Sequence, residues 1–247
     1  MKNITLEKII NKKLNSCQIH DVIPNGLQIE GIQEIKKIIT GVTACQELLD
    51  AAVKKRAQAV IVHHGYFWKN SERTITGILR NRIKTILENN INLYCWHLPL
   101  DLHSELGNNV QIGKILQLKL KGYILPLVPW GIFEQAMTEK QILNIITKKF
   151  NRLPFHYKYN ASKTIRKVAW CSGKGQGFIH SVAQHGVDAF LTGEVSEETI
   201  HVAKENNFHF FSIGHHASEC GGIIALTNWL KKLSDLDVTF INVHNPV

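Results

Sequence analysis

The stretch KKIITGVTACQELLDAAVKKRAQAVIVHHG, residues 36–65, contains the repeating unit of the fold. It opens with an apolar, β-branched run typical of a buried strand, and CQELLDAAVKKR then has the apolar spacing of an amphipathic helix. A second apolar run, AVIV, follows and ends in the pair His63-His64. A strand, a helix and a second strand in this order predict a βαβ unit, whose strands lie parallel in one sheet.

This alternation extends along most of the chain. An opening helix is expected over 5–14, and an irregular, turn-rich segment with a helix starting near Thr138 is expected over 120–165. The remaining patterns are strands at 91–97, 165–173, 187–194, 208–216 and 237–243, and helices at 76–90, 105–117, 175–186, 196–207 and 217–233. The sequence therefore predicts an α/β protein with largely parallel sheets.

The second half of the chain repeats the first. ENN precedes the strand INLYCW and then His97-x-x-x-Asp101, and a second ENN precedes FHFFSI and then His215-x-x-x-Glu219. Likewise AVIVHH matches AFLTGE, which places Glu194 opposite His64. We therefore expect two duplicated α/β domains, 1–125 and 126–247, with equivalent strand ends brought together at their interface.

Strand ends are where open α/β sheets place their chemistry. Imidazole nitrogens and carboxylate oxygens without thiolate suit zinc, manganese, iron, cobalt or nickel. His215 and Glu219 have the i, i+4 spacing that puts two side chains on one face of a helix. Five donors are too few to close two metal sites, but they can hold two divalent ions with open water positions, as catalytic metals require. These five predicted ligands are His63, His64, Asp101, His215 and Glu219.

Two further residues, His97 and Glu194, each have two alternative roles. His97 either lines the site, as a ligand or a proton carrier, or orients Asp101 or a ligand imidazole. Glu194 is either a general acid or base facing the cavity, or a carboxylate favoured by the dipole of the following helix. His216 is expected to face away from the site. The other histidines are read as hydrogen-bonded structural residues, among them His103, His156 and His209.

Composition argues against a membrane protein, a disulfide-bonded protein and a nucleic-acid-binding protein. The 247 residues include no apolar stretch long enough to span a bilayer, and the polar start has no signal core, so we expect a cytoplasmic protein without a membrane partner. The five cysteines are odd in number and form no C-x-x-C pair, which indicates reduced thiols. The net charge of +9 comes from short basic doublets and triplets, which favours a solvated surface over a nucleic-acid-binding face.

Five segments carry a family pattern: DVIPNGLQ, VIVHHGYFWKN, HLPLDLHSELGNN, LTGEVSEETIH and GHHASECGGI. They resemble the NIF3-like family, in its short bacterial form that lacks a long inserted middle domain. The resemblance covers essentially the whole chain. It implies two intertwined α/β domains with a mixed sheet in each and a dinuclear metal site at their interface, held by the five residues named above. It also implies a toroidal homohexamer with the metal sites facing an internal cavity.

The leading hypothesis is a divalent-metal-dependent hydrolase that acts on a purine nucleotide. Metal-activated water opens the imidazole ring of guanine, as in GTP cyclohydrolase I chemistry, and Glu194 or His97 transfers protons. One alternative is a non-catalytic metal-binding or interaction protein. Another is a hydrolase of damaged nucleotides or of DNA.

Overall fold

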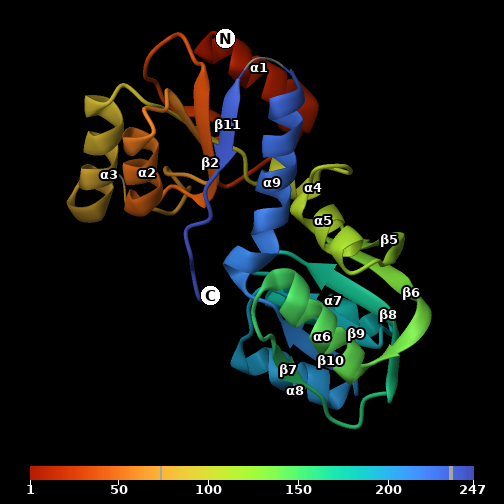
Figure 1. Ribbon diagram of the computed structural model, residues 1–247. Helices are drawn as coiled ribbons and strands as arrows, with labels where there is room; N and C mark the ends of the chain where they lie inside the picture. The colour runs from red at the N-terminus through yellow and green to blue at the C-terminus, as the bar shows by residue number, and fades with distance from the viewer. Residues whose placement is uncertain (73, 234–235) are drawn as a thin grey trace. The chain divides into compact units, whose positions relative to one another are not determined.

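The computed structural model describes residues 1–72, 74–233 and 236–247 of an α/β chain with two mixed sheets (Figure 1). The chain divides into two compact units. The first consists of Met1–Leu106 and Gly222–His244, and the second of Gly107–Gly221 and Asn245–Val247. These units differ from the expected ranges 1–125 and 126–247, because the chain returns to the first unit after it completes the second. The expected intertwining of the two units is therefore present in the chain path.

The first unit contains a five-stranded sheet in the order β1-β4-β3-β2-β11. β11, β2, β3 and β4 are parallel neighbours, and β1 pairs antiparallel with β4 at the edge. The last strand of the chain thus extends the sheet that the first half begins. The strands are β1 (Gly26–Ile29), β2 (Lys37–Thr43), β3 (Ala59–His64), β4 (Asn92–Cys95) and β11 (Asp237–Phe240).

Helices cover both faces of this first sheet. Figure 1 shows α2 and α3 on one face and α1 and α9 on the other. α9 contributes its first two turns to the second unit and the rest to the first. The short α4 follows β4 directly. The bounds are α1 (Asn3–Leu14), η1 (Ser16–Gln18), α2 (Gln46–Lys54), α3 (Gly77–Glu88), α4 (Leu98–Leu102) and α9 (His215–Leu233).

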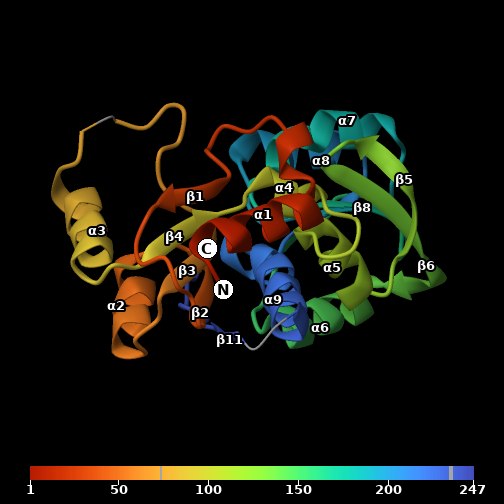
Figure 2. The same ribbon diagram turned by 90° about the horizontal axis from the view of Figure 1, so that it is seen from above.

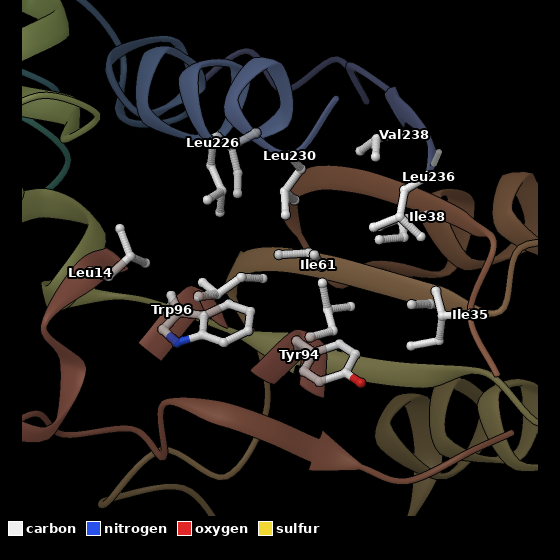
Figure 3. Close-up of a cluster of buried hydrophobic side chains, with 14 of the residues drawn as sticks. Leu14, Ile35, Ile38, Ile61, Tyr94, Trp96, Leu226, Leu230, Leu236 and Val238 are labelled. Atoms are coloured by element: carbon white, nitrogen blue, oxygen red, sulfur yellow. The ribbon is translucent and has the colours of Figure 1, made fainter. Parts of the chain in front are cut away.

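Alternate residues of β3 supply the cores on the two faces of the sheet. Ala59 and Ile61 pack in the cluster with α1 and α9, whereas Val60 and Val62 pack with α2 and α3. Because both faces are covered, the strand is apolar throughout, as expected for a central parallel strand. Figure 3 shows the α9 side, where the buried rings of Tyr94 and Trp96 are stacked 5.7 Å apart beneath Leu226 and Leu230. This packing fixes the strand ends that follow β3 and β4.

The second unit contains a six-stranded sheet in the order β5-β6-β8-β9-β10-β7. β8, β9 and β10 are parallel, whereas the β5–β6, β6–β8 and β10–β7 pairs are antiparallel. This sheet is less parallel than the sequence suggested, because the segment expected to be irregular forms a hairpin and an edge strand. The strands are β5 (Lys119–Leu125), β6 (Val128–Thr138), β7 (Phe155–Tyr157), β8 (Thr164–Cys171), β9 (Ala189–Thr192) and β10 (His209–Ser212).

Helices also cover both faces of the second sheet. Ile112 of α5 and Ile146 of α6 pack in one cluster, and Val182 of α7 and Val202 of α8 pack in the other. Figure 2 shows α6 and the α7–α8 pair on opposite faces. α6 starts as expected at Thr138, which caps the helix in a capping box with Gln141. The bounds are α5 (Asn108–Ile115), α6 (Glu139–Phe150), η2 (Gln176–Phe178), α7 (Ile179–Gln184) and α8 (Glu197–Glu205).

The two units share one topology. The order α1-β1-β2-α2-β3-α3-β4 in the first matches α6-β7-β8-α7-β9-α8-β10 in the second. In each, three parallel strands follow an edge strand that pairs antiparallel with the last of them. This match confirms the predicted duplication and makes β3 equivalent to β9, and β4 to β10. Within the described ranges, the structure has no helix both long and apolar enough to cross a bilayer.

Candidate metal centre

Three histidines converge in the first unit, at the ends of β3 and β4. His63 and His64 end β3, and their ring centroids are 4.6 Å apart. His97 precedes α4, and its ring lies 5.1 Å from that of His63 and 5.8 Å from that of His64. One ring nitrogen from each of the three lies within 4.8 Å of the others. The structure thus brings the predicted ligands His63 and His64 together with His97.

The backbone sets the orientation of the buried His63 ring. Its Nδ1 lies 3.0 Å from the carbonyl oxygen of Trp96, which can only accept, so Nδ1 carries the proton. The other ring nitrogen, Nε2, faces Asp101 of α4, whose Oδ2 lies 3.5 Å away. A histidine that donates one N–H to a carbonyl and presents the other nitrogen is the usual arrangement of a metal ligand.

Asp21 orients His97. Its Oδ1 lies 2.9 Å from His97 Nδ1, and its Oδ2 accepts hydrogen bonds from the Leu98 amide and the Asn25 side chain. Burial alone would raise the pKa of Asp21, but the hydrogen bonds from His97 and Asn25 lower it to about 2. Asp21 therefore stays ionised at any physiological pH. Sequence reasoning missed this residue, although it begins the family-like segment DVIPNGLQ.

Side chains after the histidine pair enclose the group. The Trp68 ring lies edge-on to His97 with 5.0 Å between centroids, and 5.9 Å from His64. Thr43 Oγ1 lies 3.3 Å from His64 Nδ1. Tyr66 is buried and donates its hydroxyl to the Ala44 carbonyl, as expected of a packing residue. Trp68 is therefore the aromatic residue of this segment that contacts the histidines.

In the second unit, His215 begins α9 and lies between two carboxylates. Its Nε2 is 3.2 Å from Glu219 Oε2, one helical turn later, and its Nδ1 is 2.7 Å from Glu194 Oε1. The other Glu194 oxygen accepts a hydrogen bond of 3.1 Å from the Gln176 side chain. The i, i+4 prediction for His215 and Glu219 is therefore correct, because the helix starts at His215 itself. Glu194 orients the ring from the equivalent strand end after β9.

Electrostatics favours a cation at His215. Burial by itself lowers the pKa of His215, but Glu219 and Glu194 together raise it to about 9. Burial alone would raise the pKa of Glu194, but the hydrogen bonds from His215 and Gln176 lower it. Both carboxylates thus stabilise positive charge on or beside the imidazole.

Gly173 lies directly against this pair. A Cβ placed on it would lie 2.1 Å from Glu219 Oε1 and 3.2 Å from His215 Nε2, and its φ of +59° favours glycine. The Gly173 amide donates to Ser218 Oγ, which donates in turn to the His215 carbonyl. The glycine after β8 therefore keeps the loop close to the His215–Glu219 pair without occupying its space.

The two units use one donor arrangement. In each, a histidine turns Nδ1 toward an oxygen that fixes its proton, and turns Nε2 toward a helical carboxylate, Asp101 of α4 or Glu219 of α9. The nitrogen and oxygen donors of these two groups fit zinc, manganese, iron, cobalt or nickel. His103 instead contacts the Lys13 carbonyl and accepts from backbone amides, so its expected structural role is correct.

The family model for Duf34/NIF3 (NGG1p interacting factor 3) matches residues 1–246. The chain belongs to this family. A relative from Buchnera aphidicola subsp. Baizongia pistaciae, named "GTP cyclohydrolase 1 type 2 homolog", is 61% identical over all of both chains. A relative of the same name from Escherichia coli strain K12 is 54% identical, also over the full length of both. A solved structure described as protein ybgI, of unknown function, has a TM-score of 0.98 and 54% identity with complete coverage of both chains.

Family membership confirms the resemblance seen in the five sequence segments. Full coverage in both directions also agrees with the short form, in which no middle domain is inserted. The relatives share a name that refers to a cyclohydrolase, whereas the solved structure is described without a function. The Duf34/NIF3 fold is thus established for this chain.

Proposed function

We propose that the two histidine–carboxylate groups hold two divalent metal ions. His63, His64 and Asp101 supply the donors of the first unit, and His215 and Glu219 those of the second. The observation that carries the proposal is that His63 and His215 each present Nε2 to a carboxylate while Nδ1 is held by an oxygen. Gly173, which leaves space beside Glu219, supports the same assignment.

We further propose that the protein is a hydrolase acting on a purine nucleotide, with GTP as the first candidate substrate. The name shared by relatives that are 54–61% identical over their full length supports this substrate class. Bound divalent ions supply Lewis-acid activation of water near neutral pH. Addition of one water at C8 of guanine opens the imidazole ring to a formamide, and a second water releases formate.

Two side chains of this protein are suited to move protons in that reaction. Glu194 is partly exposed, is hydrogen-bonded to His215, and has a lowered pKa, so it is a carboxylate at neutral pH and can accept a proton. His97 has Nδ1 fixed by Asp21, so Nε2 is the nitrogen that can accept and return a proton. We assign the two residues as the proton-transfer groups.

The test is turnover of GTP by metal-loaded protein, followed as formate release and by the fluorescence of any pterin formed. Glu219→Ala is the decisive variant, and Glu205→Ala is its matched control, because Glu205 is an exposed carboxylate at the end of α8. The proposal expects metal-dependent formate release that Glu219→Ala abolishes and Glu205→Ala retains. Equal rates in all three proteins would reject GTP as the substrate.

That negative result would shift attention to the alternatives. Damaged nucleotides and DNA would be assayed with the same protein and the same variants. Turnover of none of them, together with metal binding that Glu219→Ala removes, would indicate a non-catalytic metal-binding or interaction protein. The metal proposal and the substrate proposal can therefore fail separately.

We also propose a toroidal homohexamer, which the family resemblance supports. Light scattering coupled to size exclusion should give six times the 28.0 kDa mass of the chain. A monomeric or dimeric mass at micromolar concentration would reject it.

A further inference from the structure

A second histidine cluster lies within the second unit, apart from the residues described above. His156 of β7 and His209 of β10 lie on neighbouring antiparallel strands, and Glu139 is the first residue of α6. His156 Nε2 is 3.1 Å from His209 Nδ1, and His156 Nδ1 is 3.4 Å from Glu139 Oε1. One donor atom from each of the three lies within 4.8 Å of the others. Sequence spacing alone does not predict this cluster, and it leaves both histidines as expected structural residues.

The outer nitrogens of the two rings each face an acceptor. His209 Nε2 lies 2.8 Å from the Ser162 carbonyl oxygen, so its proton is on Nε2. His156 Nδ1 faces the Glu139 carboxylate, which favours a proton on Nδ1 over a lone pair. When both rings are neutral, the two inner nitrogens, His156 Nε2 and His209 Nδ1, are then both unprotonated. Two lone pairs that face each other at 3.1 Å repel unless a cation lies between or beside them.

A shared proton is the simplest such cation, and a metal ion is the alternative. Neutral imidazole is the form that binds metals. Stacking on Phe211, with 4.4 Å between ring centroids, keeps the His156 ring in place.

We propose that His156 Nε2 and His209 Nδ1 bind one zinc-class transition-metal ion, with Glu139 and the Ser162 carbonyl orienting the two rings. Zinc–nitrogen bonds of about 2.0–2.1 Å at a tetrahedral angle separate two nitrogens by about 3.4 Å, so the observed pair needs to open only slightly. Carboxylate- and carbonyl-oriented histidines are the usual outer partners of such ions. The ion would bind two neutral imidazoles, so the contact of Glu139 with Lys158 does not have to break.

A surface cavity of about 740 Å³ adjoins the Glu139 side of the cluster. Glu139 and Ser162, the two orienting groups, both line it, together with Lys140, Lys158 and Lys163. The remaining coordination positions of the ion would therefore be open to water or to a small anion drawn by the lysines. An ion with two protein ligands and open positions is exchangeable rather than a permanent structural metal.

The test is the location and number of bound zinc ions in the full-length protein. The expected result is an anomalous-scattering peak at the zinc edge between His156 and His209 in crystals grown with zinc. His156→Phe keeps a ring to stack on Phe211 and removes the ligand, so it should lose one zinc ion per chain in equilibrium dialysis. His201→Gln is the control, because His201 is an exposed histidine on α8, and it should keep the wild-type count.

The proposal would be overturned by the lack of an anomalous peak between the imidazoles, or by an unchanged zinc count in His156→Phe. Melting curves recorded with chelator establish that the variant is folded. If they show a misfolded variant, Glu139→Gln replaces it, with at least tenfold weaker zinc binding as the expected result. Nitrogen NMR that shows a proton on an inner nitrogen at neutral pH, in the presence of zinc, would assign the pair to a shared proton and reject the metal. Loss of activity at the first centre has no bearing on these readouts.

Discussion

His215 presents Nδ1 to Glu194 at 2.7 Å and Nε2 to Glu219 at 3.2 Å, so one imidazole is held between two carboxylates from different elements. Glu194 follows β9, and Glu219 is one turn into α9. The raised pKa of about 9 at His215 means that, without a metal, a proton supplies the positive charge at neutral pH. Metal binding at Nε2 must therefore displace that proton, and metal affinity should rise with pH up to about 9.

Glu194→Gln should separate orientation from proton transfer. Glutamine can still accept the hydrogen bond from His215 through its amide oxygen, but it has no charge and cannot accept a proton. Metal affinity should fall about 10- to 100-fold, as for other outer partners of metal ligands. If Glu194 transfers protons as proposed, saturating metal restores metal content but not turnover. Recovery of full turnover at saturating metal would leave Glu194 with an orienting role alone.

Gly173→Ala should damage the second histidine–carboxylate group. The added methyl group would lie 2.1 Å from Glu219 Oε1, and a φ of +59° costs a non-glycine residue about 1–2 kcal/mol. We expect unfolding free energy to drop by about 2 kcal/mol or more in urea titrations, with weaker metal binding. Gly177→Ala is the matched control, since nothing lies within 4 Å of its added methyl group. Equal stabilities of the two variants would show that the loop does not press on Glu219.

Asp21 should make stability depend on acid pH. Its folded pKa of about 2 lies below the ordinary aspartate pKa of 3.8, so the unfolded chain binds more protons between these values. Its contribution is therefore present in full above about pH 4 and is lost as the pH falls toward 2. The shift corresponds to about 2 kcal/mol, which Asp21→Asn should remove at pH 6 but not at pH 2.

The measurement for Asp21 is urea unfolding of both proteins from pH 2 to pH 6. The exposed Glu47→Gln serves as control, and its difference from wild type should not change across that range. A constant difference between wild type and Asp21→Asn would contradict the lowered pKa.

Cysteine reactivity should follow burial. Burial raises the pKa of both Cys95 and Cys220 to about 12, whereas Cys17 is exposed. A thiol reagent at pH 8 should therefore modify Cys17 at least ten times faster than Cys95. Mass spectrometry of the labelled peptides measures the order, and all five thiols should react in urea. Early labelling of Cys95 in native protein would contradict the buried position of β4.

The sequence predicted the helices and strands in which apolar residues recur with regular helical or strand spacing. β3 is recognisable as a buried strand because both faces of its sheet are covered, so its residues are apolar throughout. His215 and Glu219 are four residues apart, which is the spacing of one helical turn. The hairpin of β5 and β6 was missed because Gly122, Pro129 and Gly131 indicate turns. Pro129 is tolerated because it lies just before Trp130, where the described pairing with β8 begins.

Contacts between distant residues explain the other omissions. Asp21 contacts His97, which lies 76 positions later in the sequence, and the segment DVIPN alone predicts only a turn. His156 and His209 become neighbours only because β7 pairs with β10, and β7 is too short to predict. The sequence also does not predict that most of α9 and all of β11 belong to the first unit, since only tertiary packing shows which sheet a C-terminal strand joins.

The central claim is that the two histidine–carboxylate groups bind divalent metal ions, and metal counting tests it most directly. Asp101→Asn, Glu219→Gln and the double variant would be made in a His156→Phe background, so that only this centre contributes. Bound metal per chain would be measured by mass spectrometry after dialysis against equal manganese or zinc. The account predicts that each single variant binds less metal than the background protein and that the double variant binds least, because Asp101 and Glu219 each supply a carboxylate ligand. Metal content in the double variant equal to that of the background protein would contradict it.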